Sequence, residues 1–306
     1  MSDPFTIRKV GPRPPGPSPP MQTPSRRHGA VGARLRGRRL ELVAAALLVP
    51  LLGLGELANA SEKKEVLTGD DEVFVETERR EIALAPAGTL RVVNHLGDVR
   101  ARRAATDQLS VISIVQRFRP DQDDARVPIT EENGSVEVTA LFPSAISEAN
   151  DQGLAGRIDL TLLVPSGAEM TVETKQGLIE IKGVRRKLEA RSTSGPIRVS
   201  TSQSVRAHSE SGMVGVTLRS PGAEEPARLS TRSGRIRVDF PEDPLPALLA
   251  RTGGEILVHS LPQNPKPAED DPTISVLQIG KKPSVIHVES QTGSIKLHAM
   301  KSSRLR

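Results

Sequence analysis

A short pattern of apolar and polar positions recurs along residues 170–298. Each copy has a polar stretch that ends in a glycine, followed by apolar residues two and four positions later. The glycines of this stretch stand at positions 177, 195, 212, 234, 254 and 293, so their spacing stays close to twenty positions until the last interval, which is close to twice that. A period near twenty residues is the sequence signature of a repeat architecture in which each unit stacks on its neighbours.

Aligning the chain on these glycines gives four apolar columns. The columns seven and five positions before the glycine contain Leu90, Met170, Leu188, Val205, Ala227, Ala247 and Ile286, and Val92, Val172, Ala190, Ala207, Leu229, Leu249 and Val288. The columns two and four positions after it contain Val99, Val136, Ile179, Ile197, Val214, Ile236, Ile256 and Ile295, and Ala101, Val138, Ile181, Val199, Val216, Val238, Val258 and Leu297. Apolar residues two apart predict a β-strand with one buried face on each side of the glycine.

The chain must turn between these two strands, because their inward positions are offset by an odd number of residues. Glycine suits such a turn. The predicted turn glycines are Gly97, Gly134, Gly177, Gly195, Gly212, Gly234, Gly254 and Gly293. Neighbouring units must then stack to bury their apolar faces. The sequence therefore predicts an all-β, single-stranded β-helix (a solenoid) of about eight rungs, with repeats of roughly 17–22 residues.

Three positions before the glycine lies a column of small polar residues, which continues the inward face. It contains Asn94, Thr174, Ser192, Ser209, Thr231 and Ser290. A buried hydroxyl needs a hydrogen-bond partner, so we expect these side chains to bond the backbone of the turn or its copy on the next rung. Arg251 interrupts the column and predicts a distorted rung there.

The repeats resemble a known family. The segment Leu-Leu-Val-Pro-Ser-Gly-Ala-Glu-Met-Thr-Val-Glu-Thr-Lys-Gln-Gly-Leu-Ile-Glu-Ile-Lys-Gly at 162–183, followed by Ser-x-Ser-Gly-x-Ile-x-Val repeats, is similar to the bacterial putative-adhesin (toast-rack) family of β-strand-repeat domains. The resemblance covers about 90–298 and implies an extracytoplasmic β-solenoid without assigned catalytic residues. The polar loop at 143–156 and the proline-rich insert at 261–273 depart from the family pattern.

The segments around the repeats complete the domain plan. Residues 61–71 are predicted to be a charged linker, 72–300 the solenoid domain, and 301–306 a frayed tail. Within the domain, alternation predicts a first strand at 72–83 and a longer one at Leu109–Phe118. Residues 274–279 are expected to supply a partial rung before the last one.

Charge separates the leader from the rest of the chain. Residues 1–60 hold nine Lys or Arg and three Asp or Glu, which gives +6, whereas the remainder holds 33 and 34, which gives −1. The basic pI of about 9.7 therefore belongs to the leader, and nucleic-acid binding loses its main support. The segment 1–39 is rich in Pro, Gly and Arg and is predicted to be disordered.

Residues 40–60 carry the features of an export signal. An apolar run at Leu42–Leu54 follows four arginines, and Ala58-Asn59-Ala60 before Ser61 fits signal-peptidase cleavage, with Ala58, Ala60 and Ser61 as the cleavage residues. The prediction is a periplasmic or secreted protein, with an inner-membrane anchor at 40–57 as the alternative. The start of translation, Met1 or Met21, stays open. The chain has no cysteine, which excludes a lipoprotein anchor and disulfides.

Candidate chemistry is sparse. Five of the six histidines fall in the turns or at outward positions of the domain (His95, His208, His259, His287 and His298), and His28 lies in the leader. His259 and His298 share a column, but the interrupted spacing predicts that they are not adjacent. No metal or other cofactor site is predicted, and the acidic stretch Asp121–Asp124 offers too few ordered ligands for calcium. No nucleophile elbow, P-loop or dinucleotide fingerprint occurs, so no enzyme activity is predicted.

Binding remains the main functional class. Five arginines of the central rungs form a candidate stripe for anionic ligands: Arg198, Arg206, Arg232, Arg235 and Arg237. Such residues also serve simply to keep strands soluble. The sequence thus predicts an exported, non-enzymatic scaffold whose partner is an envelope protein or surface polymer. The alternatives are an anionic-glycan or surface-binding module and, less favoured, a polysaccharide-active enzyme that uses acidic loops.

Overall fold

The computed structural model describes residues 60–68, 71–117, 125–142, 156–220, 225–261, 266–267, 271–280 and 285–301. The chain divides into two compact units, Met1–Leu54 and Gly55–Arg306, and every described residue belongs to the second. This unit consists of β-strands in two 11-stranded mixed sheets, and the described residues form no helix. The prediction of an all-β fold is confirmed. The predicted leader and most of the export signal lie outside the described residues.

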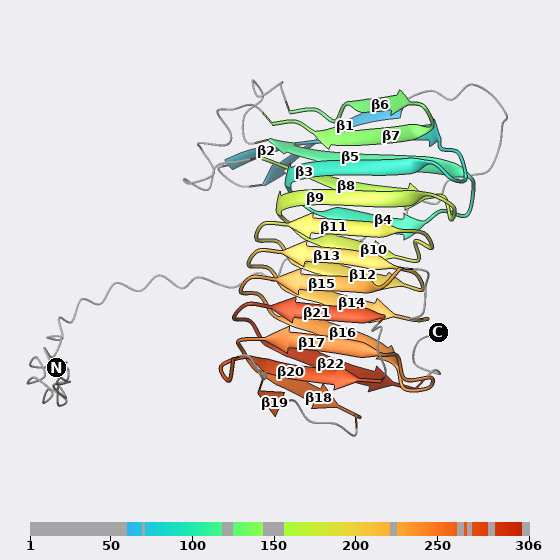
Figure 1. Ribbon diagram of the computed structural model, residues 1–306. Helices are drawn as coiled ribbons and strands as arrows, with labels where there is room; N and C mark the ends of the chain where they lie inside the picture. The colour runs from blue at the N-terminus through green and yellow to red at the C-terminus, as the bar shows by residue number, and fades with distance from the viewer. Residues whose placement is uncertain are drawn as a thin grey trace, which may run out of the picture. The chain divides into compact units, whose positions relative to one another are not determined.

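The chain passes back and forth between the two sheets, here called sheet A and sheet B (Figure 1). The alternating strands in sheet B are β3 (Thr89–Leu96), β9 (Glu169–Gln176), β11 (Leu188–Ser192), β13 (Val205–Ser209), β15 (Ala227–Thr231), β17 (Leu248–Thr252) and β21 (Ile286–Ser290). Each continues into a strand of sheet A: β4 (Val99–Arg103), β10 (Ile179–Lys182), β12 (Ile197–Thr201), β14 (Val214–Leu218), β16 (Ile236–Pro241), β18 (Ile256–His259) and β22 (Ile295–Met300). We call each such pair of strands a rung.

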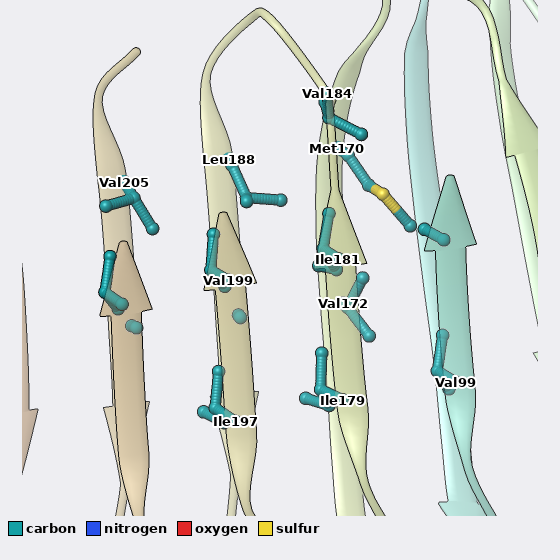
Figure 2. Close-up of a cluster of buried hydrophobic side chains, with 14 of the residues drawn as sticks. Val99, Met170, Val172, Ile179, Ile181, Val184, Leu188, Ile197, Val199 and Val205 are labelled. Carbon is teal, nitrogen blue, oxygen red and sulfur yellow. The ribbon is translucent and has the colours of Figure 1, made fainter. Parts of the chain in front are cut away.

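Neighbouring rungs pair in parallel with equivalent residues side by side. Ile179 of β10 pairs with Val99 on one side and Ile197 on the other, and all three side chains are fully buried. Figure 2 shows Ile179 beside Ile197, with Ile181 and Val199 as the next row along the same strands. The core between the sheets is therefore built from rows of small aliphatic side chains, as the β-branched columns indicate.

The column of small polar residues forms hydrogen bonds with the turns between the strands and with the neighbouring rungs. Ser209, Thr231 and Ser290 are buried, and each hydroxyl accepts a hydrogen bond from the backbone N–H of the glycine three residues later, at 2.9, 3.0 and 2.9 Å. Thr174 donates instead to the Ser192 hydroxyl of the next rung at 3.2 Å. The predicted bonding of this column, to its own turn or to the neighbouring rung, is confirmed.

The turn glycines stack directly on one another. A Cβ added at Gly195 would lie 1.9 Å from the carbonyl oxygen of Gly177, and one at Gly212 would lie 2.1 Å from that of Gly195. Any side chain there would force the rungs apart, so close approach, rather than a left-handed backbone, requires glycine at Gly195 and Gly212.

Gly134 is a different kind of turn, and its prediction as a rung turn is wrong. It forms a hairpin with Asn133, at φ values of 77° and 50°, between β6 (Ile129–Glu132) and β7 (Ser135–Ala140). Strand β7 lies in sheet B beside β3, with Val136 paired to Leu90. The prediction failed because apolar residues two and four positions after a glycine follow a hairpin as readily as a rung turn.

The rung that begins with β17 has a shorter turn than predicted. Thr252, not Arg251, continues the inward face and pairs with Ser290, and Leu248 and Ala250 take the inward places predicted for Ala247 and Leu249. The buried Thr252 hydroxyl accepts from the Gly254 N–H at 2.9 Å and donates to the carbonyl of Gly293 at 2.6 Å. Loss of one turn residue shifts every preceding inward position by one, so Arg251 does not enter the core.

At the C-terminal end the rungs do not stack in chain order. The last rung, β21 and β22, lies between the rung of β15 and β16 and the rung of β17 and β18. Strand β20 (Ser275–Ile279) pairs antiparallel with the far side of β17, and β19 (Lys266–Pro267) pairs with β20. The prediction of a partial rung at 274–279 before the last rung is therefore wrong: β20 lies outside β17 in sheet B, next to the edge strand β19.

The N-terminal end is built from longer antiparallel strands. These are β1 (Ala60–Thr68), β2 (Asp71–Ala83), β5 (Gln108–Arg117) and β8 (Arg157–Val164), which pair successively in sheet A before β4. Strand β2 corresponds to the strand predicted at 72–83. Residues 61–68 of the segment predicted as a linker instead belong to β1, which pairs along its length with β2.

Candidate functional site

The five arginines of the predicted stripe do not share one face. Arg198 on β12 and Arg237 on β16 point outward from sheet A, whereas Arg206 on β13 points outward from sheet B. Arg232 and Arg235 lie in the turn between β15 and β16. The prediction of a single stripe is wrong, because outward positions on the two halves of a rung face opposite sides of a two-sheet stack.

Sheet A nevertheless gathers cations in one column across its strands. The register places Arg198 beside Gly215, Gly215 beside Arg237, and Arg237 beside Lys296. Lys296 belongs to the last rung, and it joins this column only because that rung lies next to β16. The column of Arg198, Gly215, Arg237 and Lys296 is the candidate binding surface.

The cations of this column differ in their partners. Arg237 donates to both carboxylate oxygens of Asp239, from Nε at 3.0 Å to Oδ2 and from Nη2 at 3.1 Å to Oδ1. These hydrogen bonds, and then the attraction of the carboxylate, raise the pKa of Arg237 above its usual value. Arg198 and Lys296 form no ion pair with any residue that the structure describes. Two cationic groups therefore remain available to an external anion.

Beside this column lies a row of titratable groups. His298 pairs with Asp239 on one side and with His259 on the other. Its Nδ1 lies 3.1 Å from Oδ1 of Asp239, and its ring meets that of His259 edge-on, with centroids 6.3 Å apart. The prediction that His259 and His298 are not adjacent is wrong, since it assumed rungs in chain order. Within the described part of the chain, no three His, Cys, Asp or Glu side chains converge on a possible metal position.

Toward the N-terminal end, the same face of sheet A balances its charges internally. Glu180 on β10 accepts from Arg102 at 2.6 Å and pairs with Lys182 at 2.6 Å. The hydrogen bonds from Lys182 and Arg102 lower the pKa of Glu180 from 4.5 to about 2. Arg102 and Lys182 thus share the charge of one carboxylate, which compensates part of their attraction for another anion.

Sheet B carries its own ion pairs and two surface grooves. Arg206 pairs with Glu225 at 3.2 Å, and both side chains are well exposed. A groove of about 310 Å³ includes His95 and Lys175, and burial and the nearby Lys175 charge lower the pKa of His95. A second groove, of about 550 Å³, lies over β17 and β21 and includes His287 and Ile274.

The N-terminal end of the domain has an open charged pocket that the sequence analysis missed. Its volume is about 490 Å³, and β2 and β5 line it with two ion pairs, Arg117 to Glu76 at 3.0 Å and Arg80 to Glu78 at 2.6 Å. The alternation of β2 could have revealed it, because Glu76, Glu78 and Arg80 occupy positions of one strand face, two residues apart. Arg117 is further tied to the backbone carbonyl of Ala125 at 3.0 Å.

Comparison with known proteins finds matches among solved structures. No protein-family model matches the chain, and no curated protein matches it. A putative cell adhesion protein from Clostridium sporogenes is 12% identical, covers 73% of this chain and 100% of its own, and has a TM-score of 0.39. A putative adhesin from Bacteroides fragilis is 10% identical, covers 73% of this chain and 97% of its own, and has a TM-score of 0.30.

In the part of the chain that the structure describes, no helix is long and apolar enough to cross a membrane.

Proposed function

We propose that this protein is an exported, non-enzymatic β-solenoid that acts as an adhesin-like or envelope-associated interaction scaffold. The observation that carries the proposal is the in-register pairing of successive rungs, in which equivalent residues of β9, β11 and β13 lie side by side. Such pairing spaces the outward side chains of each sheet at about 4.8 Å from rung to rung. Two extended faces with fixed side-chain positions suit binding to a partner of similar extent.

The core supports this proposal by making the faces rigid. Its rows of Val, Ile, Leu and Ala are almost fully buried from Leu90 to Leu297, and hydroxyls of the small polar column hold several of the turns. A surface that is already ordered loses little conformational freedom when a partner binds. The partner would be an envelope protein or a surface polymer.

The position of β1 is compatible with removal of an export signal. The predicted cleavage before Ser61 falls at the first residues of β1, which begins at Ala60. A product that starts at Ser61 would therefore keep the pairing of β1 with β2, from Ser61 opposite Glu78 to Thr68 opposite Asp71. Export and cleavage would leave both sheets complete.

The test is fractionation of cells that express the full chain with a C-terminal tag, followed by N-terminal sequencing of the product. We expect a soluble extracytoplasmic product that begins at Ser61. A membrane-bound product that retains Leu42–Leu54 would mean an anchored protein instead. A cytoplasmic product with an intact leader would contradict the proposal.

A matched control separates signal cleavage from folding. The double variant Ala58→Leu/Ala60→Leu removes the small residues that signal peptidase requires but leaves every inward position of the rungs unchanged. We expect this variant to be uncleaved and retained in the membrane. Limited proteolysis should release from it the same folded β-strand domain as from the parent chain. Degradation of this domain by the protease would show that the substitutions disturb β1.

A further inference from the structure

Gly215 is unlike the turn glycines. It is the only glycine inside a strand among the described residues, at an outward position of β14. A Cβ built there would meet a single atom within 4 Å, the carbonyl oxygen of Ile197 at 3.8 Å, whereas the turn glycine Gly195 would clash at 1.9 Å. Its φ lies outside the left-handed region. Neither packing nor backbone conformation therefore requires glycine, although glycine weakens a strand.

The missing side chain leaves a gap in the outward row of sheet A. Arg198 borders this gap from β12 and Arg237 borders it from β16. Along the chain, the neighbouring half-buried side chains are those of Thr217 on β14 and of Met213 just before it, two residues away on either side. Two strand spacings put the Cα atoms of the two arginines about 9.6 Å apart, with exposed peptide backbone between them. We call this place the Gly215 gap.

The cations at the Gly215 gap have unused donor groups. Arg198 is exposed and forms no ion pair within the described ranges of the chain. Arg237 uses Nε and Nη2 for Asp239, and no described group accepts from its Nη1. Lys296 lies one strand further along the same column and is likewise without an ion pair among these residues. An anion in the gap would meet the two guanidinium groups, with an ammonium group close by.

We propose that the Gly215 gap binds a carboxylate or sulfate group of an anionic polysaccharide, between the guanidinium groups of Arg198 and Arg237. Guanidinium donors match the paired oxygens of such groups. Lys296 contacts the next acidic group of a polymer that runs across the strands. This inference rests on the proposed function as an exported scaffold and names the chemical class of its partner.

The surroundings of the gap favour a polysaccharide over a nucleic acid. The chain contains no Trp or Tyr, so neither the bases of a single-stranded nucleic acid nor the rings of a sugar find an indole or phenol side chain to stack on. The part of the chain beyond residue 60 carries a net charge of −1, which does not support binding to any polyanion by bulk charge alone. Recognition would have to be local, at a column where cations outnumber carboxylates.

The decisive variant is Gly215→Thr, which changes no charge. The space above Gly215 accommodates the added atoms, and a β-branched residue suits a strand, so we expect a melting temperature equal to or above that of the parent. The side chain fills the gap and holds the anion away from the guanidinium groups. We expect the affinity for low-mass dextran sulfate, measured by calorimetry at 150 mM NaCl, to fall by about tenfold or more.

Two charge variants form a matched pair. Arg198→Gln removes one cation at the gap, and Arg206→Gln removes one cation from the opposite sheet with the same change in net charge. We expect Arg198→Gln to weaken dextran sulfate binding by about tenfold and Arg206→Gln to change it by less than about twofold. Polygalacturonate replaces sulfate by carboxylate, and uncharged dextran is the negative control.

Several outcomes would overturn the inference. Full affinity in Gly215→Thr would show that the gap is not the site, and equal losses in Arg198→Gln and Arg206→Gln would show unspecific attraction. Equal affinity for double-stranded DNA, or no binding of either acidic polysaccharide, would also reject it. Export and signal cleavage of the same variants are read separately. Intact export without polysaccharide binding rejects this inference alone, whereas a cytoplasmic product rejects the proposed function.

Discussion

The central rungs and the C-terminal rungs follow the same local rules but differ in how they are assembled. From β9 to β16 each rung stacks on the one before it in the chain, and its turn glycine follows the previous one after a single repeat. Beyond β16 this order changes. Strands β17 and β18 follow next in the chain but lie two places away from β15 and β16, and β20 pairs with the far side of β17. Strands β21 and β22, the last in the chain, occupy the place between these two rungs. The interval between Gly254 and Gly293, close to two repeats long, reflects this detour.

The difference shows that matching surfaces, rather than chain order, select neighbours in the stack. The turn at Gly293 fits that at Gly234 as closely as any central pair, since an added Cβ would lie 1.9 Å from the Gly234 carbonyl oxygen. The turn at Gly254 is one residue shorter and fits Gly293 more loosely, at 2.7 Å. The shorter turn is thus found on the end rung, where sheet A has no further strand among the described residues.

The largest expected effect is an all-or-none crosslink that reports rung order. The chain has no native cysteine, so introduced pairs can be read without interference. Asp239→Cys with His298→Cys places the two thiols on adjacent strands, within the Cα separation that a disulfide needs. We expect nearly complete crosslinking under mild oxidation, measured by mass spectrometry of non-reduced peptides.

The matched pair is Asp239→Cys with His259→Cys, which lies two strands apart, at about 9.6 Å, and should not crosslink. If the rungs stacked in chain order, the second pair would crosslink and the first would not. That result would contradict the inserted last rung.

The next largest effect concerns the core of the inserted rung. Leu297 is fully buried between Val238 and Val258, so Leu297→Asp places an unpaired carboxylate between two rungs. We expect the free energy of unfolding to fall by about 4 kcal/mol. Val258→Asp, at a half-buried position of the end rung, should cost about half as much. Urea unfolding measures both, and equal losses would argue that the last rung is not enclosed.

A smaller effect separates the turns of the two regions. Gly293→Ala pushes a methyl group against the Gly234 backbone, which is itself held by its neighbours, and should cost about 3 kcal/mol of unfolding free energy. Gly254→Ala meets the Gly293 oxygen at 2.7 Å on an end rung that can move outward, and should cost about 1 kcal/mol. Thermal unfolding of the two variants checks this order, and the reverse order would contradict the looser fit of the end rung.

The smallest effect is a pH dependence in the central region. The folded chain keeps Glu180 ionised down to a pKa of about 2, whereas the unfolded chain takes up the proton near the usual value of 4.5. The unfolded state therefore binds more protons in this window, and stability that is fully present above pH 4.5 is lost as the pH falls toward 2. Glu180→Gln should remove this part of the pH dependence of the unfolding free energy, measured by urea unfolding between pH 2 and 5. An unchanged pH dependence would contradict the pairing of Glu180 with Arg102 and Lys182 in the folded chain.

Much of the fold could be predicted because it is periodic. Alternating apolar residues predict the buried face of the strand in the same way in each repeat. The Ser or Thr before each turn needs a hydrogen-bond partner, which the nearby backbone offers. The predicted inward positions of 170–238 are accordingly those that the structure buries, such as Ile179 and Val216. The pattern was ambiguous at Gly134, where a hairpin and a rung turn have the same apolar spacing, and at Arg251, where the turn is one residue shorter than in the other repeats.

The candidate site was harder to predict because it depends on neighbours in space. The sequence marked Arg198 and Arg237 as outward, but it also grouped them with Arg206, which lies on the other sheet. The repeat places Gly215 at the same outward position as Arg198 and Arg237, three residues after a turn glycine. Which side chains border it depends on the strands that lie beside β14. Lys296 and the pair of His298 with Asp239 could not be placed without knowing that the last rung is inserted.

The sequence by itself determined the all-β character, the faces of the strands and the turns of the central rungs, because these follow from side-chain alternation and from the glycines that close approach requires. Only the tertiary structure decided which rung lies beside which, where β19, β20 and the N-terminal hairpins end the sheets, and which cations share a face. These features depend on contacts between segments that are far apart in the chain, such as the hydrogen bond from Thr292 to the carbonyl of Arg232. No periodic pattern along the chain records such contacts.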